Sequence, residues 1–202
     1  MRKGLCVPMM ALVLLLAGCG AGEKEDPRAA YQEMAGCTME ATVRCDQEGL
    51  DWEGTLRCDY VPGGQSTVEV VAPELLAGVK AIISDRDWSL SYEGETLNIA
   101  PLSEEELSPA VCLPRLMDAV RSGWLLEENR ETWNGEACIR LLVDQSGASG
   151  GKVVSAFWLR EEDAVPLHAE LAVGEETVFT VEFTEFDFDD TIEGMEAAAS
   201  ER

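Results

Sequence analysis

The stretch TMEATVRCDQEGLDWEGTLRCDY, residues 38–60, contains the clearest structural signal in the sequence. Apolar and polar residues alternate along residues 38–46, and they alternate again along residues 51–60. A period of two residues with one apolar face is typical of antiparallel β-strands whose other face meets water. We therefore expect a β-hairpin here, with residues 47–50 as its loop.

The polar residues of this hairpin also predict its register. Folding the two strands about the loop brings three favourable cross-strand pairs onto the solvent face: Glu40 with Arg57, Thr42 with Thr55, and Arg44 with Glu53. A slip of one residue would break these pairs and move the apolar side chains to the solvent face. The charge pattern and the apolar pattern therefore agree on one register.

Further strands are expected on both sides of one helical segment. Short strand patterns separated by turn-forming residues follow one another between residues 67 and 99. Residues 103–123 carry an apolar stripe of helical period that Pro114 interrupts, which predicts one kinked helix or two short ones. Strands resume over residues 124–188, and a β-bulge near residues 184–185 would bring the phenylalanines of the last strand to one face.

The predicted fold is α+β and mainly antiparallel, with about eleven strands, a short helix at residues 26–36 and a helical lid. A strongly twisted sheet of this size curls, so we expect a half-barrel over residues 26–188. Because the core of a curled sheet is also the lining of any cavity in it, the aromatic residues of the concave face are the candidate ligand-lining residues. These are Trp52, Trp88, Phe157, Trp158, Phe179 and Phe183.

Seven cysteines raise the question of disulfides or a metal site. Cys6 and Cys19 lie in the N-terminal segment, and the others show no Cys-x-x-Cys spacing and no nearby histidine, so no metal site is expected. In the predicted register Cys45 and Cys58 are roughly 20 Å apart, too far for a disulfide. Buried free thiols are the favoured interpretation, and at most two disulfides are the alternative, for the remaining five: Cys37, Cys45, Cys58, Cys112 and Cys138.

The N-terminal segment has the pattern of a secretory signal peptide. Arg2 and Lys3 precede an apolar run that is shorter than the roughly 20 residues needed to span a bilayer. The run ends in LAGC, residues 16–19, which resembles the lipobox of bacterial lipoproteins, whose cysteine carries acyl chains such as palmitate. We therefore predict a signal peptide at residues 1–18 and a tether at residues 19–25 that is lipidated on Cys19. An ordinary signal peptide with an incidental cysteine is the alternative.

The composition is strongly acidic, with 39 Asp and Glu against 15 Lys and Arg and a net charge of −24. Such a surface repels phosphates, which excludes nucleic acid as a partner. A basic exported protein is compatible with this charge, although acidic runs such as residues 104–106 and 161–163 are usually only solvated. Residues 189–202 lack an apolar pattern and are predicted to form a disordered acidic tail.

No catalytic motif is present in the sequence. There is no Gly-x-Ser-x-Gly, no glycine-rich phosphate loop and no spaced pair of histidines. The single histidine, His168, alternates with Leu167 and Ala169 in a predicted strand, so an exposed or rim position is expected for it. The prediction is a protein that is not an enzyme and that needs no cofactor.

The order of helix, strand meander, proline-containing helix and strand meander behind a lipobox resembles the LolA/LppX-type lipoprotein-carrier superfamily. VVAPELLAG at residues 70–78, the strand at 88–92 leading to LNI at 97–99, and AVPL at 164–167 carry this resemblance. It implies an incomplete β-barrel with a helical lid, which in several members binds acyl chains or lipidated partners. The layout is also similar to germination lipoproteins of spore-forming Gram-positive bacteria, one of which supports a cell-wall amidase.

Together these observations predict a non-catalytic lipoprotein on the extracytoplasmic face of the cell membrane that binds a lipid, an acyl chain or another apolar ligand in its half-barrel. The alternative is a partner-regulating envelope or spore-germination lipoprotein that holds a cell-wall enzyme through its surface. Two or three acyl chains on one residue anchor a protein stably, so an anchored protein is favoured over a shuttling carrier.

Overall fold

The computed structural model describes residues 26–47, 50–84, 87–99, 107–146 and 152–189. The helices in these ranges are α1 (Ala29–Glu33) and α2 (Pro109–Ser122). The strands are β1 (Gly36–Gln47), β2 (Leu50–Tyr60), β3 (Ser66–Ala72), β4 (Lys80–Ile83), β5 (Trp88–Tyr92), β6 (Glu95–Ile99), β7 (Trp124–Trp133), β8 (Glu136–Asp144), β9 (Val153–Arg160), β10 (Pro166–Val173) and β11 (Glu176–Asp189).

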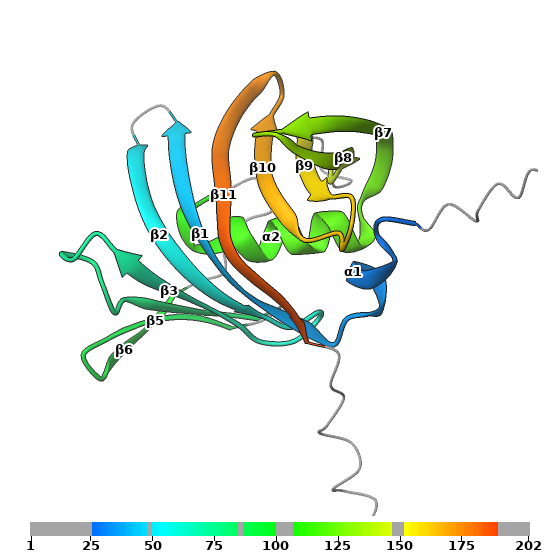
Figure 1. Cartoon of the computed structure of the whole chain (residues 1–202). Helices are drawn as coiled ribbons and strands as arrows, with labels where there is room; N and C mark the ends of the chain where they lie inside the picture. The colour runs from blue at the N-terminus through cyan, green and yellow to red at the C-terminus, as the bar shows by residue number, and fades with distance from the viewer. Residues whose placement is uncertain (1–25, 48–49, 85–86, 100–106, 147–151, 190–202) are drawn as a thin grey trace, which may run out of the picture.

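All of these strands belong to one antiparallel sheet, in the order β6-β5-β4-β3-β2-β1-β11-β10-β9-β8-β7. The first and last strands therefore pair at the centre of the sheet, and β6 and β7 are its two edges. The sheet curls, and α2 crosses its concave side (Figure 1). The predicted half-barrel of about eleven strands is confirmed.

The hairpin of β1 and β2 has the predicted register. Glu40 pairs with Arg57, Thr42 with Thr55 and Arg44 with Glu53. Both charged pairs form ion pairs on the solvent face, with 2.8 Å from Arg57 Nη2 to Glu40 Oε2 and from Arg44 Nε to Glu53 Oε2. The alternate residues of β1 are buried on the other face, as the period of two requires.

The predicted bulge in β11 is also confirmed. Glu40 of β1 pairs with Glu185 and Ala41 pairs with Phe183, so Thr184 is the extra residue. The bulge brings Phe183, Phe186 and Phe188 to the core side, where their rings contact one another in edge-to-face geometry. The strand ends at Asp189, one residue beyond the predicted domain boundary at 188.

The helix α2 forms the centre of the core. It is one helix that continues through Pro114, and most of its side chains are buried. It contacts β2 and β3 in one half of the sheet and β8 and β9 in the other. At its C-terminal end, a Cβ on Gly123 would lie 2.3 Å from Val143 Cγ1, so only glycine permits this approach to β8.

The short helix α1 lies against the C-terminal end of α2. Tyr31 Oη donates a hydrogen bond to the carbonyl of Ala164 (2.7 Å), and its ring packs edge-on against Phe188. Arg28 Nη1 donates to the carbonyl of Gly123 (3.1 Å). The helix is shorter than predicted for residues 26–36, because β1 already begins at Gly36.

The predicted signal peptide (1–18), the lipidated tether (19–25) and the tail after Asp189 lie outside the described residues, as do residues 103–106 of the predicted helical segment. Within the described ranges, neither helix has the length and the apolar character that a membrane span requires.

Candidate functional site

An apolar groove lies on the concave face, between the sheet and the first turn of α2. It has a volume of about 390 Å³. Its lining is apolar apart from Ser89 and Ser108, and comprises Trp52, Leu56, Val68, Val70, Leu76, Val79, Ala81, Ile82, Ile83, Trp88, Ser89, Leu90, Ile99, Ser108, Pro109 and Ala110. The groove therefore belongs to the β2–β6 half of the sheet.

In this half of the sheet α2 packs mainly against β2 and β3, and the groove lies beside its first turn. One row of mutually opposed residues crosses five strands: Cys58, Val68, Ala81, Leu90 and Leu97. Their exposure rises along the row from 0% at Cys58 to 3%, 6%, an intermediate value and finally 63% at Leu97. The row is thus core at one end and uncovered apolar surface at the other.

The two tryptophans of the groove are held by different contacts. Trp88 Nε1 donates a hydrogen bond to the carbonyl of Ser84 (3.0 Å), which fixes the ring at the start of β5. Trp52 lies over the backbone of Gly54, where a Cβ would be 2.4 Å from the indole ring and 2.6 Å from the carbonyl oxygen of Ala72. The absence of a side chain at Gly54 therefore makes room for Trp52. An isolated glycine in an alternating strand pattern is the sequence signal for such an approach.

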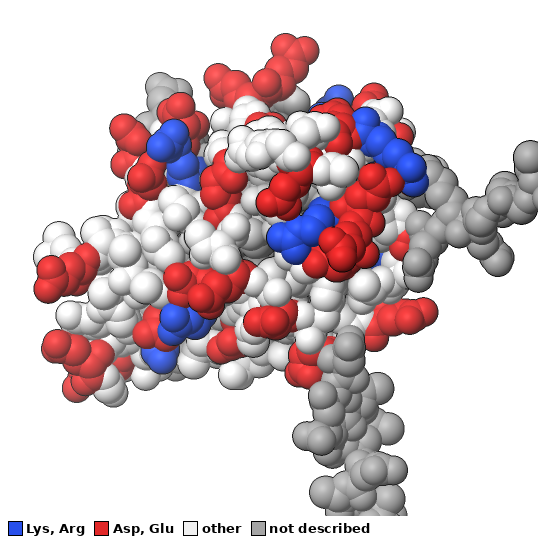
Figure 2. Space-filling view, in the orientation of Figure 1, with Lys and Arg blue, Asp and Glu red and all other residues white. Residues whose placement is uncertain are grey.

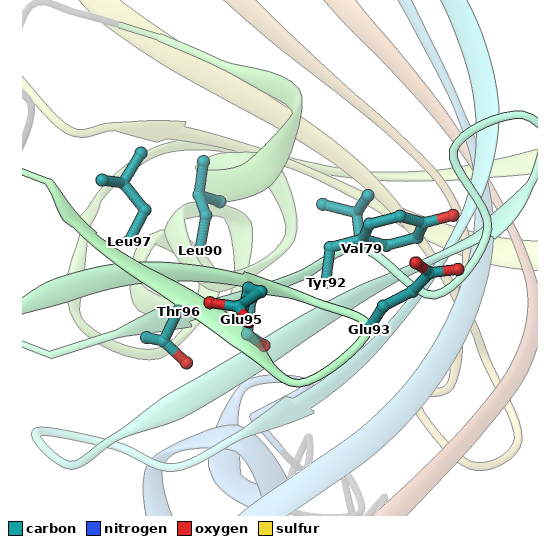
Figure 3. A pocket seen from close by; sticks show the side chains of 8 residues that line it. Val79, Leu90, Tyr92, Glu93, Glu95, Thr96 and Leu97 are labelled. Carbon is teal, nitrogen blue, oxygen red and sulfur yellow. The ribbon is translucent and has the colours of Figure 1, made fainter.

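A second, shallower depression of about 620 Å³ surrounds the β5–β6 hairpin (Figure 3). It shares Val79 and Leu90 with the groove, so the two lie next to each other. Leu90 and Leu97 lie side by side on one side of the hairpin in this view. Glu93 and Glu95 border the depression, so the apolar surface ends at an acidic rim.

The structure separates the six predicted lining residues. Trp52 and Trp88 line the groove. Phe157 and Phe179 are 0% and 1% exposed in the main core and do not border the groove. Phe183 is partly buried against the same core.

The structure corrects the prediction that Trp158 lines the cavity, because its side chain does not face the interior. Successive side chains of a strand point to opposite faces, and Phe157 occupies the core side of β9. Trp158 lies in a small second cluster on the outer face, with Cys138 and Ala156. Its Nε1 donates to Glu131 Oε2 (3.1 Å), and the guanidinium of Arg140 lies over its ring at 5.2 Å.

The prediction of an exposed or rim position for His168 is wrong, because this outer cluster covers it. Its ring stacks on Trp133, with centroids 4.2 Å apart, and it is 2% exposed. Its Nδ1 lies 2.8 Å from a carboxylate oxygen of Glu182. Because the ring is covered, a dissolved substrate cannot reach it.

The five cysteines of the domain are buried free thiols, as favoured from the sequence. Burial raises the pKa of Cys37 to about 12, and burial likewise raises the pKa of Cys58 and of Cys112 well above the ordinary value. Since the thiolate is the reactive form, these side chains act as small apolar residues and not as nucleophiles.

No protein-family model matches this sequence, and no curated protein matches it. Among solved structures, the chain is similar to a LolA superfamily protein from Nitrosomonas europaea (11% identity, 82% of this chain and 92% of that chain, TM-score 0.44). It is also similar to the lipoprotein LppX from Mycobacterium tuberculosis (10% identity, 81% of this chain and 91% of that chain, TM-score 0.41). A third similar structure is a putative outer membrane lipoprotein-sorting protein domain from Vibrio parahaemolyticus (13% identity, 87% of this chain and 95% of that chain, TM-score 0.40).

The architecture is a curled antiparallel half-barrel whose concave side is crossed by α2. At identities of 10–13%, the similarity concerns the arrangement of the chain and not its ligand. In this half-barrel, α2 fills the inner part of the concave face, and the apolar groove lies beside its first turn.

Proposed function

We propose that this protein is a non-catalytic LolA-like lipoprotein, anchored through Cys19 on the extracytoplasmic face of the cell membrane, that binds an apolar ligand in the groove. The groove itself carries the proposal: a cavity of about 390 Å³ whose lining is apolar except for two serine hydroxyls. Ligand pockets have volumes of ~300–1,000 Å³ and linings of this kind. Covering such a surface is favourable by roughly 25 cal/mol per Å².

The shape of the apolar surface favours a chain-like ligand. The groove shares Val79 and Leu90 with the depression at the β5–β6 hairpin, where Leu97 is 63% exposed. A lipid or acyl chain lying along this surface would cover Leu90 and Leu97 together. Each methylene that it buries would contribute about 0.8 kcal/mol.

Filling the groove tests this proposal. Ala110, in the first turn of α2, lines the groove, and Ala110→Phe places a ring into it while leaving it apolar. The matched control is Ala137→Phe, at an exposed position of β8. Native mass spectrometry of the delipidated protein mixed with a monoacylglycerol should show a one-to-one complex for the wild type and the control, and none for Ala110→Phe. A wild-type protein that takes up no monoacylglycerol would refute the binding function.

The anchor is tested separately. Cys19 ends the lipobox-like LAGC, and Cys19→Ser removes the thiol that would carry the acyl chains. In cells, metabolic labelling with palmitate should mark the wild-type chain and not Cys19→Ser, and only the wild type should fractionate with membranes. Equal membrane association of both would contradict the anchor.

A second function, regulation of a basic exported cell-wall enzyme in the envelope or in spore germination, draws its support from the net charge of −24. Figure 2 shows acidic side chains spread over one face, with Lys and Arg beside several of them. On the solvent face of the sheet, Arg44 pairs with Glu53 and Arg57 with Glu40. A contact with dispersed charge is weakened by salt, so co-purification of the enzyme should be lost at high ionic strength.

A further inference from the structure

The start of β7 presents an exposed apolar run that neither the core nor the groove uses. Trp124 is 77% exposed, Leu125 is 37% exposed and Leu126 is 45% exposed. Trp124 opposes Asp144 and Leu125 opposes the buried Val143, so these two side chains leave opposite faces of β7, and the three residues form an apolar group at the uncovered edge of the sheet. Single exposed apolar residues are ordinary, but three in succession at a sheet edge are of the kind that marks an interaction site. We call these three residues the Trp124 patch.

The Trp124 patch lies beside the N-terminal end of the described chain. The Arg28 side chain donates to the carbonyl of Gly123, the residue before Trp124, at 3.1 Å. Figure 1 shows α1 next to the point where β7 begins. Arg28 follows Cys19 by nine positions, and a residue spans at most ~3.6 Å, so the backbone from Cys19 reaches about 30 Å at most.

We infer that the Trp124 patch docks on the lipid bilayer in which Cys19 is anchored. This inference rests on the proposed anchoring through Cys19. Tryptophan favours the boundary between headgroups and acyl chains, because its ring is apolar and its N–H finds a polar partner there. Since the anchor already holds the protein at the surface, a patch of three side chains is sufficient to orient it.

The charges around the patch indicate that the contact is apolar and not electrostatic. Arg28 and Arg121 flank Gly123, but Glu127 and Glu128 follow the patch directly, and the whole chain carries −24. Glu127 pairs with Arg140 at 3.7 Å across β7 and β8. An uncharged phosphatidylcholine surface is therefore the expected partner, and added salt should change the docking little.

Docking here would also orient the groove. The helix α2 runs from Pro109 beside the groove to Ser122 beside the Trp124 patch. Its 14 residues rise by 1.5 Å each, so about 20 Å separate the two sites. The docked protein would thus hold its groove away from the point of membrane contact.

The test uses the full lipidated chain in phosphatidylcholine vesicles whose acyl chains carry bromine, which quenches a tryptophan within the bilayer. The wild type should show a quenched component that Trp124→Phe loses and that Trp133→Phe, the same change at the other end of β7, retains. Replacing Leu125 and Leu126 together by serine should reduce the quenching of Trp124. Trp124→Phe should leave the fold intact, because Trp124 is 77% exposed.

The outcomes separate the docking from the anchor. A lipidated chain that does not sediment with vesicles would overturn the anchor and the docking that depends on it. A chain that sediments, but whose quenching is the same in Trp124→Phe as in the wild type, would overturn the docking alone. A Cys19→Ser chain that dimerises through Trp124 in the absence of lipid, as judged by size exclusion of Trp124→Ser, would assign the patch to a second copy of the protein instead.

Discussion

Leu90 lies directly opposite Leu97 in the β5–β6 hairpin, yet Leu90 is half-buried and Leu97 is 63% exposed. The pair marks the place where the concave face leaves the core and becomes open surface. This boundary follows from the position of α2, which in this half of the sheet packs mainly against β2 and β3.

The first prediction concerns this boundary. Leu97→Asp should weaken binding of a monoacylglycerol at least several-fold, because it places a charge on the apolar path out of the groove. The thermal midpoint should change little, since substitutions at exposed positions usually alter stability by about 0.5 kcal/mol or less. Leu75→Asp is the matched control, because Leu75 is 87% exposed and does not line the groove. Equal loss of binding in both variants would show that added negative charge, and not the path, is responsible.

The second prediction concerns the head group of the ligand. Glu93 and Glu95 border the depression next to the groove. A long-chain amine should therefore bind more tightly than a fatty acid of the same length, with a difference that decreases at high salt. Replacing both glutamates by glutamine should reduce the difference. Isothermal titration calorimetry with the two ligands measures this difference in affinity. Tighter binding of the fatty acid would exclude an electrostatic role for Glu93 and Glu95.

The hairpin register and the β11 bulge were predictable because local patterns specify them. Glu40 and Arg57 can pair only in the register that also buries the apolar face, and two independent constraints agree. In β11, the side chains change parity between Phe183 and Phe186, and a single extra residue is the simplest way to restore one face.

The location of the groove was not predictable, because it depends on contacts between distant segments. Whether Trp88 or Phe179 borders open space is decided by where α2 lies across the sheet. His168 illustrates the same limit. The pattern of β10 shows an alternating strand, but Trp133, which covers the histidine, comes from a strand that is not its neighbour in the sheet.

The third prediction tests the packing of Trp52. Gly54→Ala should destabilise the protein by about 1–3 kcal/mol, because its Cβ would overlap the indole ring and the carbonyl of Ala72. Part of the loss should disappear in a Trp52→Leu background, where the ring is absent. Chemical unfolding of the four proteins gives the coupling energy. Additive losses would mean that the ring is not what excludes a side chain at Gly54.

The fourth prediction concerns the thiols. At pH 8 a thiol with a pKa of about 12, such as that of Cys37, is ionised in only about one molecule in 10,000, and the side chain is 2% exposed. The five domain thiols should therefore react with a thiol reagent only as fast as the protein unfolds. In denaturant all five should react at once. Fast reaction of one thiol in the native protein would contradict its burial.

The fifth prediction follows from the same burial and concerns alkaline pH. A cysteine ionises near pH 9 when unfolded, whereas folding raises the pKa of Cys37 to about 12. The folded state keeps the proton that the unfolded state loses. The contribution of this thiol to the free energy of unfolding should therefore be fully present below about pH 9 and decrease progressively between about pH 9 and 12. Cys37→Ala removes one of the buried thiols, so the thermal unfolding midpoint of this variant should fall less steeply over this pH range than the midpoint of the wild type. Thermal unfolding at a series of pH values measures both slopes. Parallel curves for the two proteins would show that the thiol of Cys37 contributes nothing to the alkaline transition.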